Sequence, residues 1–332
     1  MKEKTKNILL MILKIMLQTD VSSPLNATQI VQLAETAGCL CERKTVLRNI
    51  KCLQQNGYDI LLHPNHRLGF YMASHSFEDW ELKLLMDSVY NCSFLTAEQT
   101  ENLARKLKDF APASSLSLLC CDGIPMQNKP DKSYVKYNLD CILHAIKNKA
   151  AITFNYGQAN IKGEFIARKK GKKYVVNPYT VVLSEQRYYL VCNTKKHDGI
   201  GYYRLDRIRN PEPLTDSCLP LHSLPGFEDD NSLAEYIGKT FYMHAGNEIT
   251  VTLQCHTLCL DDVSEKFGKN CTFEYLNDEC FRITGNVVES DGFYYWLLQF
   301  GKNVEVVSPP SVRCHLLDII KDIEIAYSPQ PL

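Results

Sequence analysis

The stretch from Lys172 to Pro213 constrains the fold of this chain more than any other part of the sequence. It reads KKYVVNPYTVVLSEQRYYLVCNTKKHDGIGYYRLDRIRNPEP and places the triplet Tyr188-Tyr189-Leu190 within a run of β-branched and aromatic residues. The segment Arg204–Ile208 begins fourteen residues after Leu190. Arginines and aromatic residues therefore fall on neighbouring predicted strands. Such a surface suits a phosphate-bearing ligand with a stackable base better than it suits catalysis.

Five short strands are predicted here after a lead helix at residues 138–149, separated by turns that contain glycine or polar residues. The strands are residues 151–156, 162–167, 174–183, 187–192 and 201–205. This number of short strands fits a small barrel. Because alternate residues of a strand share a face, Leu190 and Leu205 are assigned to the core. The same alternation turns Arg187, Tyr189 and Arg204 toward a ligand.

The pairing of the Tyr-Tyr-Leu triplet with Arg204–Ile208 resembles the WYL domain, a small Sm-like β-barrel of bacterial transcription regulators. Tyr188 stands where that family usually has tryptophan. The resemblance implies a ligand sensor, with nucleotides or short single-stranded nucleic acid among its ligands. The expected ligand-binding residues are Arg187, Tyr189, Arg204 and Arg207, which fall on the motif positions, together with Tyr156 and Tyr179. The alternative is that these arginines pair with Asp206, Glu185 or the acidic C-terminal domain.

The charge of the chain is segregated, although its formal net charge is only −1. Residues 131–210 carry sixteen basic and six acidic side chains, whereas residues 211–332 carry seven basic and nineteen acidic ones. A basic middle beside an acidic end predicts that the middle meets polyanions, or that the two segments pack against each other.

The N-terminal residues 1–72 have the pattern of a winged helix-turn-helix domain. A first helix is predicted near residues 4–18, and a second begins after a cap at Asn26 or Thr28 and stops at Gly38. A third helix is predicted over residues 42–55, and its inward residues are expected to be Val46, Leu47, Ile50 and Leu53. Two strands over residues 58–62 and 67–71 would form the wing.

The third helix carries Lys44, Arg48 and Lys51 at i, i+4 and i+7, which gives one stripe of positive charge. A duplex major groove accepts a helix of this kind, with lysine and arginine on phosphates or guanine edges. The segment is similar to the third helix of DeoR-like winged helices, and the alternative is a merely solvated helix face. The expected DNA-binding residues are Arg43, Lys44, Thr45, Arg48, Lys51 and, at the tip of the wing, Arg67.

Residues 73–132 are predicted to be a helical connection. Helices over residues 77–92 and 96–110 are amphipathic, and the first places Trp80, Leu84, Leu85 and Val89 on one face. These helices suit either dimerisation or packing within one subunit. Residues 111–132 are rich in proline and serine and predict a linker and domain boundary.

The acidic C-terminal residues 216–332 follow a β-α-β-β-α-β order, which suggests a ferredoxin-like layer of helices on a sheet. The expected strands are residues 248–255, 271–276, 280–288 and 304–307, and the expected helices are residues 258–267, 292–300 and 310–327. The run FYYWLLQFG at 293–301, followed by VEVVSP, resembles the C-terminal extension often found after WYL domains. That resemblance implies dimer contacts and closure of the ligand site. Trp296 is expected in the core.

Other function classes find little support in the sequence. There is no Gly-rich phosphate loop, no Gly-x-Ser-x-Gly motif and no zinc-type spacing among the fourteen cysteines, so neither an enzyme nor a metal or cofactor site is expected. The scattered cysteines are typical of reduced thiols in the cytoplasm. No apolar run is long enough for a membrane span, and residues 8–17 are interpreted as a helix stripe.

Together these patterns predict a multidomain α+β protein that acts as a cytoplasmic, homodimeric transcription regulator. Its parts would be a winged helix-turn-helix at 1–72, a helical linker at 73–132, a Sm/SH3-like barrel at 133–215 and a ferredoxin-like α/β domain at 216–332. The protein would bind double-stranded operator DNA and a nucleotide or single-stranded nucleic acid. The alternatives are an accessory protein that binds single-stranded RNA or DNA, and a regulator that senses a small metabolite.

Overall fold

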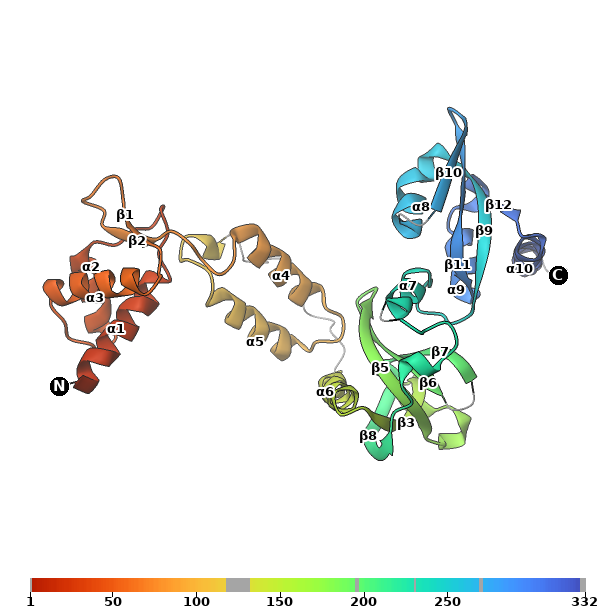
Figure 1. Cartoon of the computed structure of the whole chain (residues 1–332), viewed down its shortest axis with the longest axis horizontal. Coiled ribbons are helices and arrows are strands. Elements are labelled where there is room, and N and C mark those ends of the chain that lie inside the picture. The colour runs from red at the N-terminus through yellow and green to blue at the C-terminus, as the bar shows by residue number, and fades with distance from the viewer. Residues whose placement is uncertain (1, 118–131, 195–196, 230, 269–270, 329–332) are drawn as a thin grey trace. The chain divides into compact units, whose positions relative to one another are not determined.

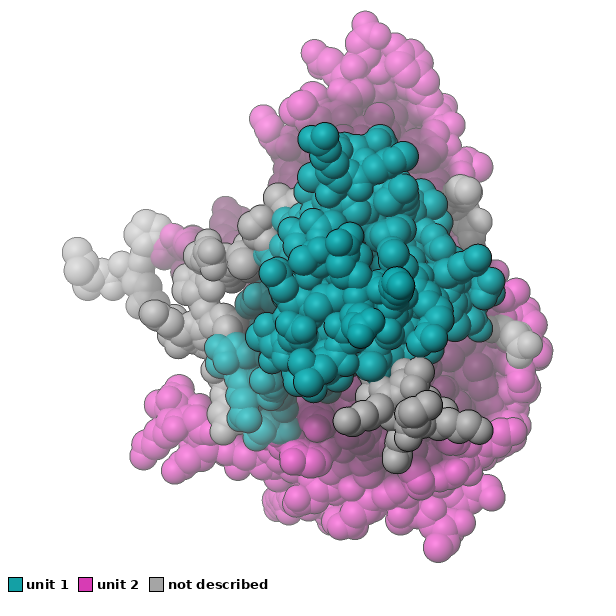
Figure 2. Space-filling model, turned by 90° about the vertical axis from the view of Figure 1, so that its left-hand side faces the viewer, with its two compact units in different colours: residues 1–133 teal, residues 134–332 magenta. Residues whose placement is uncertain are grey.

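The computed structural model describes residues 2–117, 132–194, 197–229, 231–268 and 271–328 (Figure 1). The chain divides into two compact units, residues 1–133 and residues 134–332 (Figure 2). Most of the predicted linker, residues 118–131, lies outside the described residues. Helices and several antiparallel sheets are both present, so the predicted mixed α+β class is confirmed. None of the helices described is long and apolar enough to cross a lipid bilayer.

The first unit begins with three helices and a two-stranded antiparallel sheet, in the order expected from the sequence. These elements are α1 (Lys2–Met16), α2 (Ala27–Thr36), α3 (Arg43–Gln55), β1 (Ile60–Leu62) and β2 (Phe70–Met72). The side chain of Asn26 accepts the backbone N–H groups of Thr28 and Gln29 at 3.0 Å, so it is the cap of α2. Gly69, with φ +99°, lets the carbonyl of Leu25 approach β2 where a Cβ would lie 2.2 Å from that oxygen.

The buried face of α3 differs from the prediction at one position. Leu47, expected in the core, is 44% exposed, and Asn49 is buried instead. Leu47 is one residue beyond the buried Val46, and this rotates it by about 100° onto the charged side of the helix. The amide of Asn49 donates to the carbonyl of Thr45 at 2.8 Å, so burial leaves that polar group with a partner.

A helical pair follows, formed by α4 (Asp79–Asn91) and α5 (Ala97–Lys108). Their shared core contains Leu82, Met86, Ala104 and Ala111. Trp80 and Leu84 lie outside this core and are 64% and 59% exposed. The apolar face predicted from the sequence is therefore not the face that packs within the unit.

The second unit opens with α6 (Tyr134–Lys147) and a six-stranded antiparallel sheet. The strands are β3 (Ala150–Ala159), β4 (Phe165–Ala167), β5 (Tyr174–Ser184), β6 (Arg187–Thr194), β7 (His197–Arg204) and β8 (Ile208–Ser217). Their order is β4-β3-β5-β6-β7, with β8 also paired to β3. Within the described part of the chain no ladder joins β7 to β8, so the predicted closed barrel is not formed by hydrogen bonding.

Strand β8 is an element that the sequence analysis missed. Pro211 and Pro213 lack the N–H that a ladder needs, so the pattern reads as a loop. The structure accommodates both prolines because β8 pairs only with β3 and its register shifts twice along that partner.

The remainder of the second unit contains a short helix and a four-stranded sheet with helices. These elements are α7 (Ser232–Gly238), β9 (Asn247–His256), α8 (Leu260–Phe267), β10 (Cys271–Asn277), β11 (Cys280–Glu289), α9 (Asp291–Leu298), β12 (Val304–Ser308) and α10 (Pro310–Tyr327). The strand order is β10-β11-β9-β12, and every neighbouring pair is antiparallel. Trp296 is buried against Phe241 and Phe293, as the sequence predicts. Helix α7 had not been anticipated.

Candidate ligand site

One cavity of about 450 Å³ brings together most of the residues that the sequence assigned to a ligand. It is lined by Tyr156, Glu185, Arg187, Tyr189, Tyr202, Arg204, Arg207, Tyr242, Met243, His244 and Ala245. Five of the six predicted ligand-binding residues are in this set, and Tyr179 is the exception. Residues from β3, β6 and β7 thus meet at one place, although they are up to about fifty positions apart in the chain.

A two-residue turn sets the position of Arg187. Glu185 and Gln186 both have positive φ, 46° and 60°, as a type I′ turn requires, and they join β5 to β6. The resulting register pairs Ser184 with Arg187. It also makes Tyr189 on β6 the direct cross-strand partner of Arg204 on β7, so an aromatic ring and a guanidinium share one face of the sheet.

Arg204 is held by an ion pair within its own turn. Its Nε and Nη2 donate to the two carboxylate oxygens of Asp206, at 3.0 and 2.8 Å. These hydrogen bonds raise the pKa of Arg204 above its ordinary value. Arg204 is therefore paired with Asp206, one of the partners that the sequence offered as an alternative to a ligand. The bidentate contact fixes the guanidinium at the cavity wall.

Arg187 and Arg207 differ from Arg204 in their partners. Arg187 is exposed, and no hydrogen bond or ion pair of its side chain occurs among the residues that the structure describes. Arg207 lines the cavity together with Tyr156, whose hydroxyl accepts the backbone N–H of Arg204 at 3.4 Å. Burial raises the pKa of Tyr156, so its hydroxyl stays neutral near pH 7. The guanidinium of Arg187 thus has no carboxylate partner within the described part of the chain.

The far side of the cavity comes from a loop that the sequence analysis did not identify. Residues 242–245 lie between α7 and β9, and the backbones of Tyr242 and Met243 have φ of 49° and 53°. Two successive non-glycine residues in this left-handed region are uncommon and mark a conformation held by its surroundings. No sequence motif in residues 242–245 indicated that they would line a ligand cavity. Tyr202 could have been found, because it is two residues before Arg204 on β7 and shares its face.

Tyr179 lies away from the cavity. Its ring packs against a buried cluster that includes Val191, Ile200, Leu224 and Phe227. Its hydroxyl is buried without a hydrogen-bond partner in the described structure. Burial raises the pKa of Tyr179 well above its ordinary value. The side chain is therefore part of the contact between the six-stranded sheet and residues 221–237.

The residues predicted to contact DNA lie on the surface of the first unit. Arg43, Lys44, Arg48, Lys51 and Arg67 are exposed, and Thr45 is partly exposed. The spacing along α3 puts Lys44, Arg48 and Lys51 on one face of the helix, where the exposed Leu47 also lies. Arg67 is in the connection between β1 and β2, with its N–H donating to Oδ1 of Asn65 at 3.2 Å.

Comparison with protein families identifies two domains in the second unit. Residues 137–213 match the WYL domain, and residues 247–323 match the WCX domain. The chain therefore contains a WYL domain, which carries the six-stranded sheet, followed by a WCX domain. The resemblance to a WYL domain with a C-terminal extension is confirmed. Comparison with curated proteins gives no match.

Two solved structures are similar to this chain at low identity. One is proteasome accessory factor B/C (PafBC) of Arthrobacter aurescens, with 14% identity and a TM-score of 0.30 over 97% of this chain. The chain spans about half of that protein, 49% of its length. The other is a CRISPR Cas-related protein, with 13% identity and a TM-score of 0.37, covering 76% of this chain and 75% of the other.

Proposed function

We propose that this protein is a ligand-responsive, DNA-binding transcription regulator whose WYL domain senses an anionic ligand. The observation that carries the proposal is the convergence of Arg187, Arg204 and Arg207 with Tyr156 and Tyr189 on one cavity. Guanidinium groups bind phosphate through paired hydrogen bonds, and tyrosine faces accept stacked bases at about 1–3 kcal/mol per base. The ligand class is therefore a nucleotide or a short single-stranded nucleic acid.

In this proposal Arg187 and Arg204 have different roles in binding the ligand. Arg187 is free to take a phosphate directly, because no carboxylate in the described structure neutralises it. Arg204 is oriented by Asp206 and supplies a fixed wall beside Tyr189. A rigid arginine next to a free one suits a ligand whose phosphate enters at the exposed edge and whose base lies against the tyrosines.

The first unit would read the operator. In the proposal α3 lies in the major groove of double-stranded DNA, with Lys44, Arg48 and Lys51 on phosphates or bases and Arg67 on the backbone beside it. A two-fold operator requires two such helices, so the regulator is proposed to be a homodimer. The exposed Trp80 and Leu84 of α4 support this, since the unit leaves that apolar surface uncovered.

The finer fold assignments belong to the same proposal. The first unit is proposed to be a DeoR-like winged helix-turn-helix, and the six-stranded sheet to be an open relative of the Sm-like barrel. The order β10-β11-β9-β12, built from β-α-β-β-α-β, supports a ferredoxin-like layout for the WCX domain. No catalytic step is assigned to any of these parts.

Fluorescence anisotropy with a short labelled single-stranded oligonucleotide tests the ligand site. At moderate salt the unmodified protein should bind, and Arg187→Ala/Arg204→Ala should lose that binding. Arg105→Ala, which removes an exposed arginine of the first unit, is the matched control and should bind normally. Absence of binding by the unmodified protein would reject single-stranded nucleic acid as the ligand and leave a nucleotide or another small metabolite to be titrated.

An accessory protein that binds single-stranded RNA or DNA as its main task is the second candidate, because the same cavity would serve it. Footprinting on duplex DNA separates the two functions. A regulator protects a discrete two-fold site and changes that protection when the ligand is added. An accessory protein binds single strands without protecting any duplex site.

A further inference from the structure

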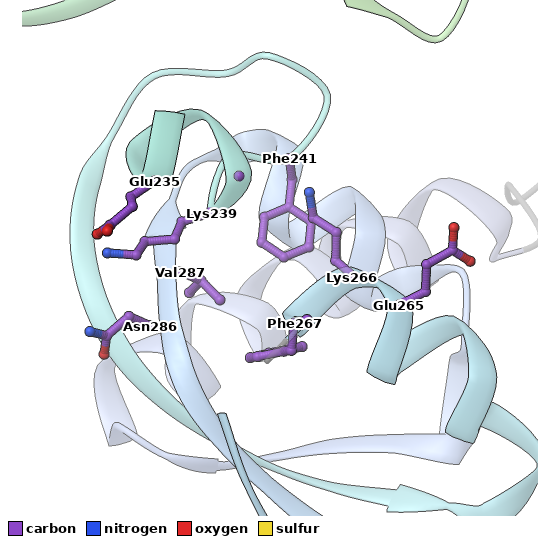
Figure 3. Close-up of a pocket in the computed structure, with 10 residues that line it drawn as sticks. Glu235, Lys239, Phe241, Glu265, Lys266, Phe267, Asn286 and Val287 are labelled. Carbon is purple, nitrogen blue, oxygen red and sulfur yellow. The ribbon is translucent and has the colours of Figure 1, made fainter. Parts of the chain in front are cut away.

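A second cavity, of about 520 Å³, lies in the C-terminal part of the second unit (Figure 3). It is distinct from the first cavity, which contains Arg187, Arg204 and Arg207 and is called the arginine cavity below. It is lined by Glu235, Gly238, Lys239, Phe241, Glu265, Lys266, Phe267, Gly268, Asn286 and Val287. No residue is shared with the first cavity. The lining comes from α7 with the loop after it, from the end of α8 and from β11, so three separate segments of the chain enclose one space.

The apolar wall of this cavity is aromatic. Phe241 packs on Trp296 with ring centroids 4.9 Å apart, and Phe267 lies 6.1 Å from the same indole. Gly285 allows Phe267 to lie against β11, because a Cβ at that position would be 2.7 Å from the phenylalanine ring. The two phenylalanine rings are thus held by the core and present apolar surface to the cavity (Figure 3).

Lys266 is the cation that matters in this cavity. Its ammonium donates to the carbonyl of Thr240 at 2.7 Å and lies 4.4 Å from the centroid of Phe241. Among the residues the structure describes it has no carboxylate partner, and only Glu185 acts on it at longer range. Burial lowers the pKa of Lys266. The ammonium group, which has three donors, therefore lies in a partly desolvated place with no negative charge in contact.

The other charged groups of the lining do not compensate Lys266. Lys239 is paired with Glu248 at 2.7 Å. In Figure 3 the carboxylate of Glu235 lies beside Lys239, at the edge of the cavity far from Lys266, and Glu265 points away from the phenylalanine rings. Among the described residues, the ammonium of Lys266 therefore lies beside the aromatic wall without a carboxylate in contact.

From this arrangement we propose that the cavity binds a small carboxylate with a planar apolar body, the carboxylate on Lys266 and the body against Phe241 and Phe267. The charge of the ligand would replace the hydration that burial removes from the ammonium. The apolar body would bury surface that the aromatic wall now exposes. This site shares no lining residue with the proposed nucleotide cavity, but Glu185 of that cavity acts on Lys266, and a third cavity is lined by residues of both sites.

Ligand-observed fluorine NMR with 4-fluorobenzoate as the probe tests the site on the full chain. The unmodified protein should broaden the probe signal saturably, and the neutral 4-fluorobenzamide should not be bound. Lys266→Met should weaken binding about tenfold, the loss of one charge-assisted hydrogen bond. Lys302→Met, at an exposed lysine elsewhere, should leave binding unchanged.

Gly238 offers a second variant that leaves Lys266 in place. A Cβ at this cavity-lining glycine would meet nothing within 4 Å, so Gly238→Leu should fill the space and abolish binding, whereas Gly238→Ala should retain it. If Lys266→Met does not fold, Gly238→Leu still tests whether the probe binds in this cavity. Absence of saturable binding, or equal binding by Gly238→Leu, would overturn the proposal.

Arg187→Ala/Arg204→Ala separates the two sites. Binding of 4-fluorobenzoate that persists in this variant supports the second cavity, even if the single-strand experiment fails. Loss of probe binding in the same variant would place the probe in the arginine cavity and refute the inference.

Discussion

The hydroxyl of Tyr202 lies 3.2 Å from Oγ1 of Thr240. Tyr202 lines the arginine cavity on β7, and the carbonyl of Thr240 accepts the ammonium of Lys266 in the second cavity. Thr240 also donates to the carbonyl of Tyr236 at the end of α7. A continuous set of hydrogen bonds thus connects β7 of the WYL domain, through Thr240, to α7 and to α8 of the WCX domain.

Tyr202→Phe should destabilise the second unit by about 1 kcal/mol, because it removes one partly buried hydrogen bond and keeps the ring. Denaturant unfolding in a Trp80→Phe background, where the tryptophan fluorescence comes from Trp296, measures the change. Tyr137→Phe, at an exposed tyrosine of α6, should have no effect. Equal stability of the two variants would show that the contact with Thr240 contributes nothing.

Asn138→Leu should lower the free energy of unfolding by more than Tyr202→Phe does. The buried amide of Asn138 donates to the carbonyls of Leu205 and Ile208, both at 3.0 Å, and so holds the turn that carries Arg207 against α6. Leucine leaves both carbonyls without this donor, which predicts a loss of about 1–3 kcal/mol in unfolding experiments, with weaker binding of the anionic ligand. Asn148→Ala removes an exposed asparagine of the same region as a control, and a matching loss there would contradict the explanation.

Asp20→Asn should show a pH-dependent effect in the first unit. Burial alone would raise the pKa of Asp20, but hydrogen bonds from Ser114, Ser23 and the backbone of Ser22 outweigh it and hold the pKa below its ordinary value. A lowered carboxyl pKa stabilises the fold above the unfolded pKa of about 3.9, and the effect is lost as the pH falls through the folded pKa.

The asparagine variant should therefore be less stable by about 1 kcal/mol at pH 7, a modest value because water screens the partly exposed carboxylate. The free energies of unfolding of the unmodified protein and of Asp20→Asn should converge in more acidic solution, below about pH 4. Asp59→Asn, at an exposed aspartate of the same unit, serves as the control. A difference that stays constant down to acid pH would exclude the carboxylate as its source.

Lys51→Ala should weaken binding to double-stranded DNA and reduce its dependence on salt. If Lys51 contacts one phosphate, the slope of log K against log salt should fall by about 0.9. Lys106→Ala on α5 should leave the slope unchanged. An unchanged slope in the Lys51 variant would mean that this face of α3 does not meet the phosphate backbone.

Local patterns in the sequence predicted the positions of the helices and strands better than they predicted which of their faces are buried. Asn26 and the glycine stops located α2, and alternation on β6 and β7 put Tyr189 and Arg204 on one side of the sheet. For α4 the sequence left open whether the face of Trp80 and Leu84 packs within one subunit, and in the structure that face is exposed while Leu82 and Met86 pack against α5. Hydrophobic size indicates which residues can be buried, and helical geometry decides which of them are.

The second side of the arginine cavity could not be predicted, because it depends on a tertiary contact. Tyr242 and His244 are distant in the chain from Arg187 and carry no motif. Strand β8 was hidden by its prolines for a local reason, and Asp206 was identified only as one possible partner of the arginines. Residues that come together only in the folded chain can be predicted from the sequence only where the period of a strand or helix places them on the same face.

Because of the turn at Glu185 and Gln186, the set of side chains that line the arginine cavity depends on the length of the chain as well as on its composition. Side chains alternate between the faces of a strand, so one residue added to this turn or removed from it would shift β6 by one position against β5. Arg187 and Tyr189 would then move to the opposite face of the sheet. A protein with the same residues in this region but a turn of different length would present a different surface to the ligand.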